Sequence, residues 1–464
     1  MDKRSSARKK KVLVIMGTRP EVIKLAPVVE ALNRPEKAWS RKTESARKTG
    51  GRFRTIICLT GQHREMVEPF LKIFGLKPDY DLRVMVPNQH LGELTGRVLA
   101  GMKKVLEAEK PDWLLVQGDT TSAMAAALAA FYQKIKIGHV EAGLRTDDKY
   151  NPFPEEINRR LISHLTDFHF APTELARQNL LAEGVRPENI FVTGNTVVDA
   201  LKMILKKSGR EDKKIKENRA AGREKIIRIT EIGATEQERG EPAGRSADRS
   251  TGQKNSGFSG GKSGASERGD FVSGSGLNRA EETLSFDRVK KIKKLILVTA
   301  HRRESFGQGL EGICRAILEI VGRIKEAEVI FPVHLNPAVR KTVLSRLKGQ
   351  ERIHLVEPLD YVTFVHLMRR ASLILTDSGG IQEEAPSLGV PVVVMRETTE
   401  RPEAIQAGVA WLAGTDPEKI TRLAVRLLKK VEDREFRRGL SRRNPFGDGR
   451  AGLRISRLLK PGDT

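Results

Sequence analysis

Three acidic residues in the first half of the sequence are candidates for acid and base chemistry. Asp119 follows the apolar run Trp113–Val116, and Glu141 follows the next such run, Ile135–Val140. Glu155 lies in the nearby segment Pro-Phe-Pro-Glu-Glu, which we expect to be a loop. When carboxylates are buried together, the pKa of at least one of them rises, which suits proton transfer near neutral pH. A single Asp after a strand is more simply a helix cap, but three acids at one edge favour catalysis.

Arg19 and Lys24 could bind an anion near the start of the chain. They lie in and just after the loop Gly-Thr-Arg-Pro-Glu at 17–21, which follows the first apolar run. Backbone N–H groups at a helix start attract negative charge, and two cations would add to that attraction. The alternative is an ordinary helix start, with Thr18 as the cap and Pro20 in the first turn. The loop alone does not decide between the two.

The second half of the sequence carries histidine and arginine where its strands should end. His301 and Arg302 follow the apolar run Leu295–Thr299, and His334 follows the next run. A histidine beside arginine at a strand end suits a phosphate or a departing diphosphate.

A Ser-Gly-Gly turn, made by Ser378, Gly379 and Gly380, follows a later apolar run. The glycines let the backbone approach a diphosphate, and the dipole of the following helix favours negative charge. Glu384 lies about one and a half turns further on, where its carboxylate could accept hydrogen bonds from ribose hydroxyls. The alternative is an ordinary capped helix start with flexible glycines. The charged segment around Arg401 follows the next strand and places more charge at the same edge of the sheet, which makes this alternative weaker.

Apolar runs and helical periodicity alternate along both halves of the chain. This rhythm predicts a doubly wound, mostly parallel sheet in each half. In the first half we predict strands at 12–16, 55–59, 113–116 and 135–140, and helices at 21–32, 65–74 and 121–132. In the second half we predict strands at 295–299, 328–333, 353–355, 373–376 and 391–395, and helices at 309–324, 336–347, 361–370 and 380–388. Ligands of such sheets bind beyond the carboxyl ends of the strands. We therefore expect two Rossmann-like domains with the site in the cleft between them.

The domain boundaries lie where this rhythm stops and restarts. We predict a basic tail at 1–11, an N-terminal domain at 12–202, a low-complexity basic insertion at 206–290, a C-terminal domain at 291–440 and a final segment at 441–464. The insertion is rich in Lys, Arg, Glu, Gly and Ser and offers little to bury, so we expect it to be disordered.

The net charge of +24 suggests nucleic-acid binding. Much of this excess falls in the tail, in the insertion and in residues 34–54 rather than in the predicted domains. Neither a zinc-finger spacing nor an aromatic-rich RNA-binding pattern accompanies it. We therefore favour a solvated basic surface over a nucleic-acid site.

The cysteine content and the length of the apolar runs indicate the compartment. The two cysteines, Cys58 and Cys314, are typical of small buried side chains in a reducing compartment. The apolar run behind the basic N-terminal residues has about five residues, fewer than a signal peptide needs. No segment approaches the ~20 apolar residues of a membrane span. We expect a soluble, cytoplasmic protein.

The segments that carry these residues resemble the non-hydrolysing UDP-N-acetylglucosamine 2-epimerases. The resemblance covers residues 12–202 and 295–450, in family order. The matching segments are VLVIMGTRPEVIKLAPVV, LTGQHREM, GDTTSAMAAALAAFY, GHVEAGLRT, NPFPEEINRRLISHL, VTGNTVVDAL, TAHRRESFG, FPVHLNP, LTDSGGIQEEAPSLGVPVVVMRETTERPEA and NPFGDGR.

The resemblance implies a fold, a reaction and an assembly. It implies two Rossmann-like domains of the glycosyltransferase-B type, with a last helix that returns to the N-terminal domain, and a homodimer. The implied reaction eliminates UDP from C1 and C2 to give a 2-acetamidoglucal, then adds UDP back with the proton on the other face of C2. Neither a metal nor a nicotinamide cofactor is needed, because elimination loosens the C2–H bond without oxidation.

The resemblance also implies roles for the matching residues. The catalytic set is Asp119, Glu141, Glu155 and His301. The set that binds the nucleotide and sugar is Arg19, Lys24, Arg145, Arg302, Ser378, Gly379, Gly380, Glu384 and Arg401. A second UDP-N-acetylglucosamine activates the bacterial relatives, and the matching positions are Gln62, His63 and His334.

Two alternative activities remain open. A hydrolysing 2-epimerase would release UDP and free N-acetylmannosamine, and a glycosyltransferase of the same fold would pass the sugar to an acceptor. The three carboxylates argue against the transferase, which needs one base at the acceptor. The insertion at 206–290 is longer and more basic than the family linker, but it removes no residue of these motifs.

Overall fold

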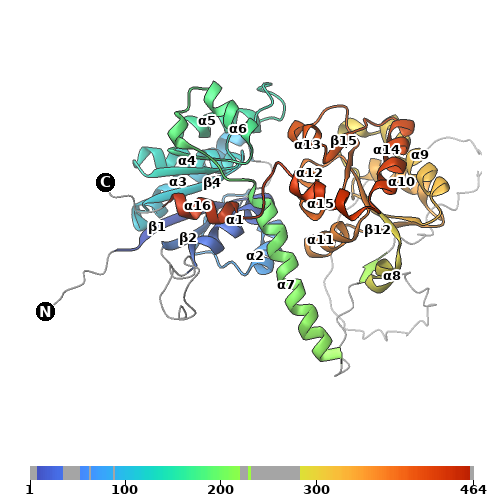
Figure 1. Ribbon diagram of the computed structural model, residues 1–464. Coiled ribbons are helices and arrows are strands. Elements are labelled where there is room, and N and C mark those ends of the chain that lie inside the picture. Colours follow the sequence, from blue (N-terminus) through green and yellow to red (C-terminus); the bar gives the residue numbers. More distant parts are fainter. Residues whose placement is uncertain are drawn as a thin grey trace, which may run out of the picture.

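The structure is a computed structural model that describes residues 8–34, 53–61, 64–86, 89–219, 228–230 and 283–459. It has two α/β domains, each built on one parallel sheet, which stand side by side in Figure 1. The prediction of two Rossmann-like domains is therefore confirmed.

The N-terminal sheet has seven parallel strands in the order β3-β2-β1-β4-β5-β6-β7. The strands are β1 (Lys10–Met16), β2 (Phe53–Leu59), β3 (Tyr80–Asp81), β4 (Trp113–Gln117), β5 (Lys136–Val140), β6 (Phe168–Ala171) and β7 (Ile190–Val192). The strand order reverses between β1 and β4, which is where doubly wound sheets bind ligands.

Helices cover both faces of this sheet, which explains why its central strands carry buried apolar side chains on both faces. Val12, Val14 and Met16 of β1 pack with α1 on one face, whereas Leu13 and Ile15 pack with α3 and α4 on the other. The helices are α1 (Arg19–Leu32), α2 (Arg64–Phe74), α3 (Leu91–Glu109), α4 (Thr121–Tyr132), α5 (Glu155–Leu165) and α6 (Glu174–Ala182).

The start of α5 differs from the sequence prediction. Glu155 is the first residue of this helix and not part of a loop. Two prolines precede it closely, which favoured a loop, but acidic side chains in the first turn stabilise a helix that begins after them.

The C-terminal sheet has six strands in the order β12-β11-β10-β13-β14-β15. They are β10 (Lys294–Thr299), β11 (Ala327–Pro332), β12 (Ile353–Val356), β13 (Leu373–Thr376), β14 (Val392–Val394) and β15 (Ala410–Leu412). The helices are α9 (Gln308–Arg323), α10 (Pro337–Leu347), α11 (Tyr361–Arg370), α12 (Gly379–Glu384), α13 (Pro402–Gln406), α14 (Pro417–Lys430) and α15 (Arg434–Arg442). Short 3-10 turns lie at Pro187–Asn189, Arg303–Ser305 and Ala385–Leu388.

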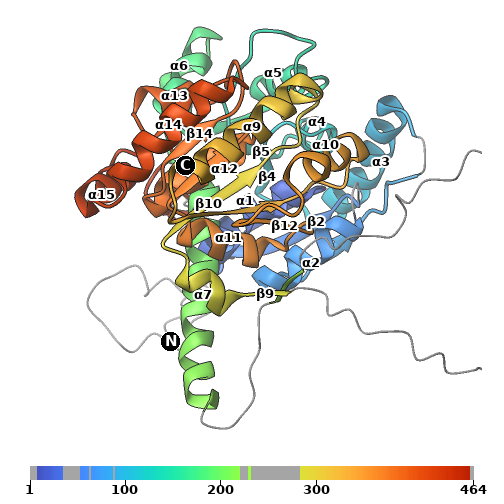
Figure 2. The same ribbon diagram turned by 90° about the vertical axis from the view of Figure 1, so that its right-hand side faces the viewer.

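Part of the predicted disordered insertion is regular. Helix α7 (Thr196–Arg219) continues well beyond residue 206 and projects from the body in Figures 1 and 2. Strand β8 (Arg228–Thr230) pairs antiparallel with β9 (Thr283–Ser285), and α8 (Phe286–Lys291) follows. Lys, Arg and Glu are good helix formers even where nothing is buried, so low hydrophobicity was a poor guide for 206–219. The rest of the predicted insertion lies outside the described residues.

The chain returns to the N-terminal domain at its end. Helix α16 (Ala451–Leu458) lies along α1, and Gly452 permits the contact, since a Cβ there would stand 2.7 Å from the carbonyl oxygen of Pro27. The Asp199 carboxylate accepts hydrogen bonds from the backbone N–H groups of Ala451 (3.1 Å) and Gly452 (3.0 Å). Burial raises the pKa of Asp199 to about 6. Among the described helices, none is long and apolar enough to cross a bilayer.

Candidate functional site

Asp119 follows β4 and is bound by two residues of α5. Arg159 places Nε and Nη2 at 2.8 and 2.7 Å from Asp119 Oδ2. Asn158 donates from its side-chain amide to the backbone carbonyl of Asp119 at 2.9 Å. Both the carboxylate and the backbone of Asp119 are therefore fixed by one helix.

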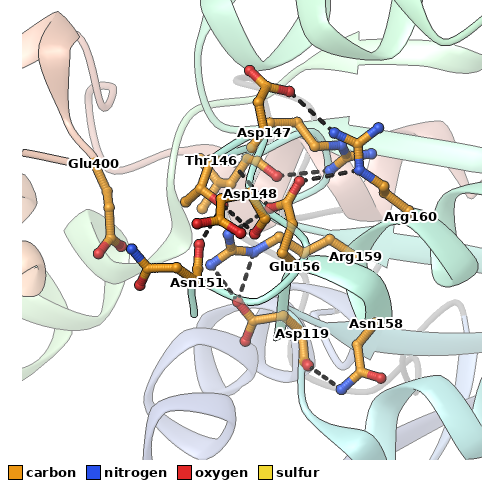
Figure 3. A network of polar contacts seen from close by, with 12 residues as sticks. Asp119, Thr146, Asp147, Asp148, Asn151, Glu156, Asn158, Arg159, Arg160 and Glu400 are labelled. Carbon is orange, nitrogen blue, oxygen red and sulfur yellow. Dashed lines mark hydrogen bonds and ion pairs between the residues drawn. The ribbon is translucent and has the colours of Figure 1, made fainter. Parts of the chain in front are cut away.

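Glu156 in turn holds Arg159, and Figure 3 shows the arginine between the two carboxylates. Glu156 is fully buried and accepts from Arg159 Nη1 at 3.2 Å and from Arg160 Nε at 3.1 Å. The backbone N–H of Thr146 donates to the same carboxylate at 3.1 Å. Glu400 of the C-terminal domain points toward this network in Figure 3. The first turns of α5 thus form a rigid support for Asp119.

Glu141 lies at the end of β5, in contact with Lys24 of α1. Lys24 Nζ lies 2.5 Å from Oε2 of Glu141, and Gln117 donates to the same oxygen at 2.8 Å. The backbone of Glu141 has a φ of +67°. Such a left-handed conformation is unfavourable for a residue with a Cβ, and strain of this kind concentrates at functional sites.

Glu155 precedes Glu156 on α5 and has a different environment. Its Oε2 is buried and has no hydrogen-bond partner within the part of the chain that the structure describes. A buried carboxylate oxygen without a partner is costly. A substrate group that donates a hydrogen bond would relieve this cost.

His301 is held by Asp377 in the C-terminal domain. The backbone N–H groups of His301 and Arg302 donate to Asp377 Oδ2 at 2.6 and 2.8 Å, and His301 Nδ1 lies 3.0 Å from Oδ1. Burial opposes the charge of Asp377, but these contacts outweigh it and lower its pKa. The imidazole of His301 stays 42% exposed and stacks on His334, with ring centroids 5.6 Å apart. Burial and His301 lower the pKa of His334.

A row of alternating charges joins the two domains. Lys24, paired with Glu141, also lies 3.9 Å from Glu383 on α12, and Glu383 is paired with Arg401 at 2.5 Å. Burial opposes both cations, but the neighbouring carboxylates outweigh it and raise the pKa of Lys24 and of Arg401. Both side chains therefore stay charged where the domains meet.

Glu384, next to Glu383, is buried among weaker partners. Tyr361 donates its hydroxyl to Glu384 Oε2 at 3.3 Å. Burial, followed by the charge of Glu383, raises the pKa of Glu384 to about 8. Tyr361 packs against Phe70 of the N-terminal domain, and the Arg19 guanidinium lies 5.9 Å from the centre of that ring. Arg19 of the N-terminal domain and Glu384 of the C-terminal domain therefore lie in the same region of the interface, on either side of the Phe70 and Tyr361 rings.

Ser378 and the two glycines lie at the start of α12, as the sequence places them. The backbone N–H of Ser378 donates to the Thr376 hydroxyl at 3.0 Å. A Cβ on Gly379 would stand 3.9 Å from the guanidinium carbon of Arg401, and one on Gly380 would stand 3.9 Å from Glu384 Oε1. The two glycines therefore lie next to Arg401 and Glu384, both of which are predicted to bind the nucleotide.

Some predicted site residues are not brought to this group. Arg145 is only 3% exposed and binds both oxygens of Glu183 at 2.7 and 2.6 Å, so its guanidinium supports the N-terminal domain. The guanidinium of Arg302 makes one long contact among the described residues, with Glu400 at 3.7 Å. Gln62 and His63 lie outside the described residues.

The residues that hold the predicted ones could not be named from the sequence. These are Glu156, Arg159, Tyr361, Asp377 and Glu383. The only sequence signal for Arg159 is its place one helical turn after Glu155, and Asp377 adjoins the predicted Ser378. In the described part of the chain, no group of three or more His, Cys, Asp or Glu side chains is arranged to hold a metal.

The sequence matches a known protein family. The family model described as UDP-N-acetylglucosamine 2-epimerase matches residues 45–231 and 275–460. The UDP-N-acetylglucosamine 2-epimerase of Yersinia pestis is 44% identical over 450 residues, which cover 97% of this chain and 98% of that protein.

Two solved structures share the fold over nearly the whole chain. The crystal structure of UDP-GlcNAc 2-epimerase from Neisseria meningitidis bound to UDP-GlcNAc is 39% identical, with a TM-score of 0.70, covering 97% of this chain and 99% of that one. The structure of UDP-GlcNAc 2-epimerase from Methanocaldococcus jannaschii is 32% identical, with a TM-score of 0.68, covering 97% and 100%.

Proposed function

The chain belongs to the UDP-N-acetylglucosamine 2-epimerase family, and we propose that it interconverts UDP-N-acetylglucosamine and UDP-N-acetylmannosamine by inverting C2. The observation that carries this proposal is the arrangement of charges at the domain interface. Carboxylates that can move a proton lie on the N-terminal domain, and Lys24 beside them contacts the charged pair Glu383 and Arg401 of the C-terminal domain.

We propose the non-hydrolysing route. A carboxylate takes the proton from C2, the C2–H electron pair forms the C1–C2 double bond, and the C1–O bond breaks so that UDP leaves with its electrons. UDP then adds back to C1 of the 2-acetamidoglucal while a second carboxylate delivers a proton to the opposite face of C2. This requires proton-transfer groups on two faces of the sugar, and Asp119, Glu141 and Glu155 are the candidates.

The environments of these carboxylates support different tasks. Asp119 is fixed by Arg159 and Glu141 by Lys24, so both are oriented by a cation. Glu155 keeps a buried oxygen without a partner in the described residues and so has room for a substrate donor. We propose that all three surround C2.

The departing UDP needs positive charge and a proton donor. His301 is partly exposed and is oriented by Asp377, so it is suited to assist the departure and return of UDP. Lys24 and Arg401 would hold the diphosphate, with Arg19 close by, and Glu384 would meet the ribose. No cofactor enters this scheme.

We also propose an activator site and a homodimer. His334 stacks on His301. A second nucleotide sugar bound at His334 would therefore lie next to the group that assists the departure and return of UDP. Gln62 and His63 would complete that site. Equilibrium ultracentrifugation tests the dimer, and substrate-saturation curves with and without a non-reacting UDP-sugar test the activation.

Proton NMR of UDP-N-acetylglucosamine in deuterated water tests the reaction. We expect both UDP-sugars to appear with deuterium at C2 and without net release of free sugar. Release of N-acetylmannosamine and UDP as the only products would instead establish the hydrolysing alternative. A product linked to an added acceptor, without deuterium at C2, would establish the glycosyltransferase.

A further inference from the structure

Glu383 is a buried carboxylate to which the reaction scheme gives no task. It lies on α12 with 1% of its side chain exposed. An unpaired buried charge is costly, so a carboxylate in such a place depends on cations and hydrogen-bond donors around it. Its partners therefore define what it can do.

The partners of Glu383 come from both domains. Arg401 of the C-terminal domain places Nε 2.5 Å from Oε1. Asn195, which follows β7 of the N-terminal domain, donates its side-chain amide to Oε2 at 3.0 Å. Lys24 Nζ, on α1, lies 3.9 Å from the same oxygen. One carboxylate thus contacts both cations that we assign to the diphosphate.

Glu383 holds Arg401 by the inner nitrogen of its guanidinium. The outer Nη1 donates to the backbone carbonyl of Glu400 at 3.0 Å. The other outer nitrogen, Nη2, lies 3.9 Å from the place where a Cβ on Gly379 would stand. Nη2 has no hydrogen bond within the described residues and remains available for an anion beside Gly379.

We propose that Glu383 is a positioning residue that orders Arg401 for the diphosphate and keeps it in register with Lys24 of the other domain. This inference rests on the proposed function, which assigns Lys24 and Arg401 to the diphosphate. Two effects of Glu383 oppose each other. Its charge repels an incoming diphosphate, but that charge is already paired with Arg401 and bonded to Asn195. A free arginine side chain, in contrast, loses much rotational freedom when it binds. We therefore expect the ordering of Arg401 to favour diphosphate binding more than the charge of Glu383 opposes it.

The test is Glu383→Gln, which keeps the size of the side chain and removes its charge. A charge-assisted hydrogen bond is lost and Arg401 becomes mobile. We expect the Kd for UDP, measured by titration calorimetry, and the KM for UDP-N-acetylglucosamine to rise about tenfold. The kcat should fall less than about threefold, because uniform binding is lost rather than transition-state stabilisation. A residue that only supported the fold would not split KM from kcat in this way.

Glu403→Gln is the matched control. Glu403 is also buried in the C-terminal domain, and it also binds across the interface, where the Thr173 hydroxyl donates to it at 2.7 Å. It makes no ion pair within the described residues. We expect this variant to bind UDP as the wild type does.

The effect of Glu383 must pass through Arg401. In an Arg401→Gln background, Glu383→Gln should weaken UDP binding by less than about twofold further, as expected for coupled residues. If Glu383→Gln does not fold, Asn195→Ser removes the amide donor and keeps a side-chain oxygen for the N–H of Val197, which Asn195 now caps at 3.0 Å. That variant should also bind UDP more weakly.

Unchanged or tighter UDP binding in Glu383→Gln, or an undiminished effect in the Arg401→Gln background, would overturn the inference. After a failure to fold, normal UDP binding by Asn195→Ser would do the same, as would a wild type that binds no UDP. A wild type that binds UDP but exchanges no deuterium at C2 refutes the proposed function alone, and UDP affinity still decides the role of Glu383.

Discussion

Arg159 places two of its nitrogens within 2.8 Å of a single oxygen of Asp119, and the other carboxylate oxygen accepts no hydrogen bond from the described residues. The arginine fixes the direction of the carboxylate and leaves one oxygen for the substrate. Arg159→Gln removes the charge and one of the two contacts. We expect exchange of the C2 proton to slow about 100-fold, the scale of lost acid–base catalysis, while UDP still binds. Deuterium incorporation and titration calorimetry check the two parts.

Arg160→Gln is the natural comparison for that variant. Arg160 follows Arg159, also binds Glu156 and has no contact with Asp119. Its loss should slow exchange less than about threefold. Equal losses in the two variants would mean that support of α5, rather than orientation of Asp119, matters.

Glu384 makes the free energy of unfolding depend on pH. Its pKa is raised from 4.5 to about 8, first by burial. Between these values the unfolded chain has released a proton that the fold still holds, so stability falls as the pH rises and the full cost is present above pH 8. Glu384→Gln should therefore stabilise the protein at pH 8.5 by up to about 5 kcal/mol, and much less at pH 5.5. Urea unfolding at both values measures this, and an equal effect at both would contradict the burial argument.

Asp377→Asn tests how His301 is held. The substitution keeps the size of the side chain but removes the charge that faces His301 Nδ1 and accepts two backbone hydrogen bonds. Assistance to the departing UDP should weaken, and kcat should fall at least about tenfold with UDP affinity nearly unchanged. Asp360→Asn, which alters the cap of α11, should leave kcat unchanged. A loss of UDP affinity as large as that of kcat would assign Asp377 to binding instead.

The segment 231–282 should be dispensable for epimerisation. Thr230 of β8 pairs antiparallel with Thr283 of β9, so the two residues that flank the segment are neighbours. A short Asn-Gly type turn can join such strands. Replacement of 231–282 by such a turn should keep kcat within about twofold. Loss of epimerisation on this replacement would show that the segment serves the site.

Most of the fold could be predicted because its strands and helices bury apolar residues at regular spacing. The predicted strand 12–16 lies within β1, and the predicted helix 121–132 coincides with α4. The prediction was wrong for 206–219, which has few apolar residues and is nevertheless helical. The start of α5 was missed because two closely preceding prolines favour a loop.

The site residues, too, could be predicted only in part. Chemistry-bearing residues at strand ends could be named from the sequence, because a doubly wound sheet gathers its strand ends at one edge. Their partners could not be named. Arg159 is 40 residues from Asp119, and Glu383 is 188 residues from Asn195. Such pairs depend on how whole elements pack, which no local pattern encodes.

The position of α16 sets an order for folding during synthesis. This last described helix covers α1, where Val28 and Val29 are buried. A ribosome makes the entire C-terminal domain before it makes α16. The N-terminal domain, although its strands are synthesised first, therefore completes its surface last, and until then an apolar face of α1 is open to chaperones.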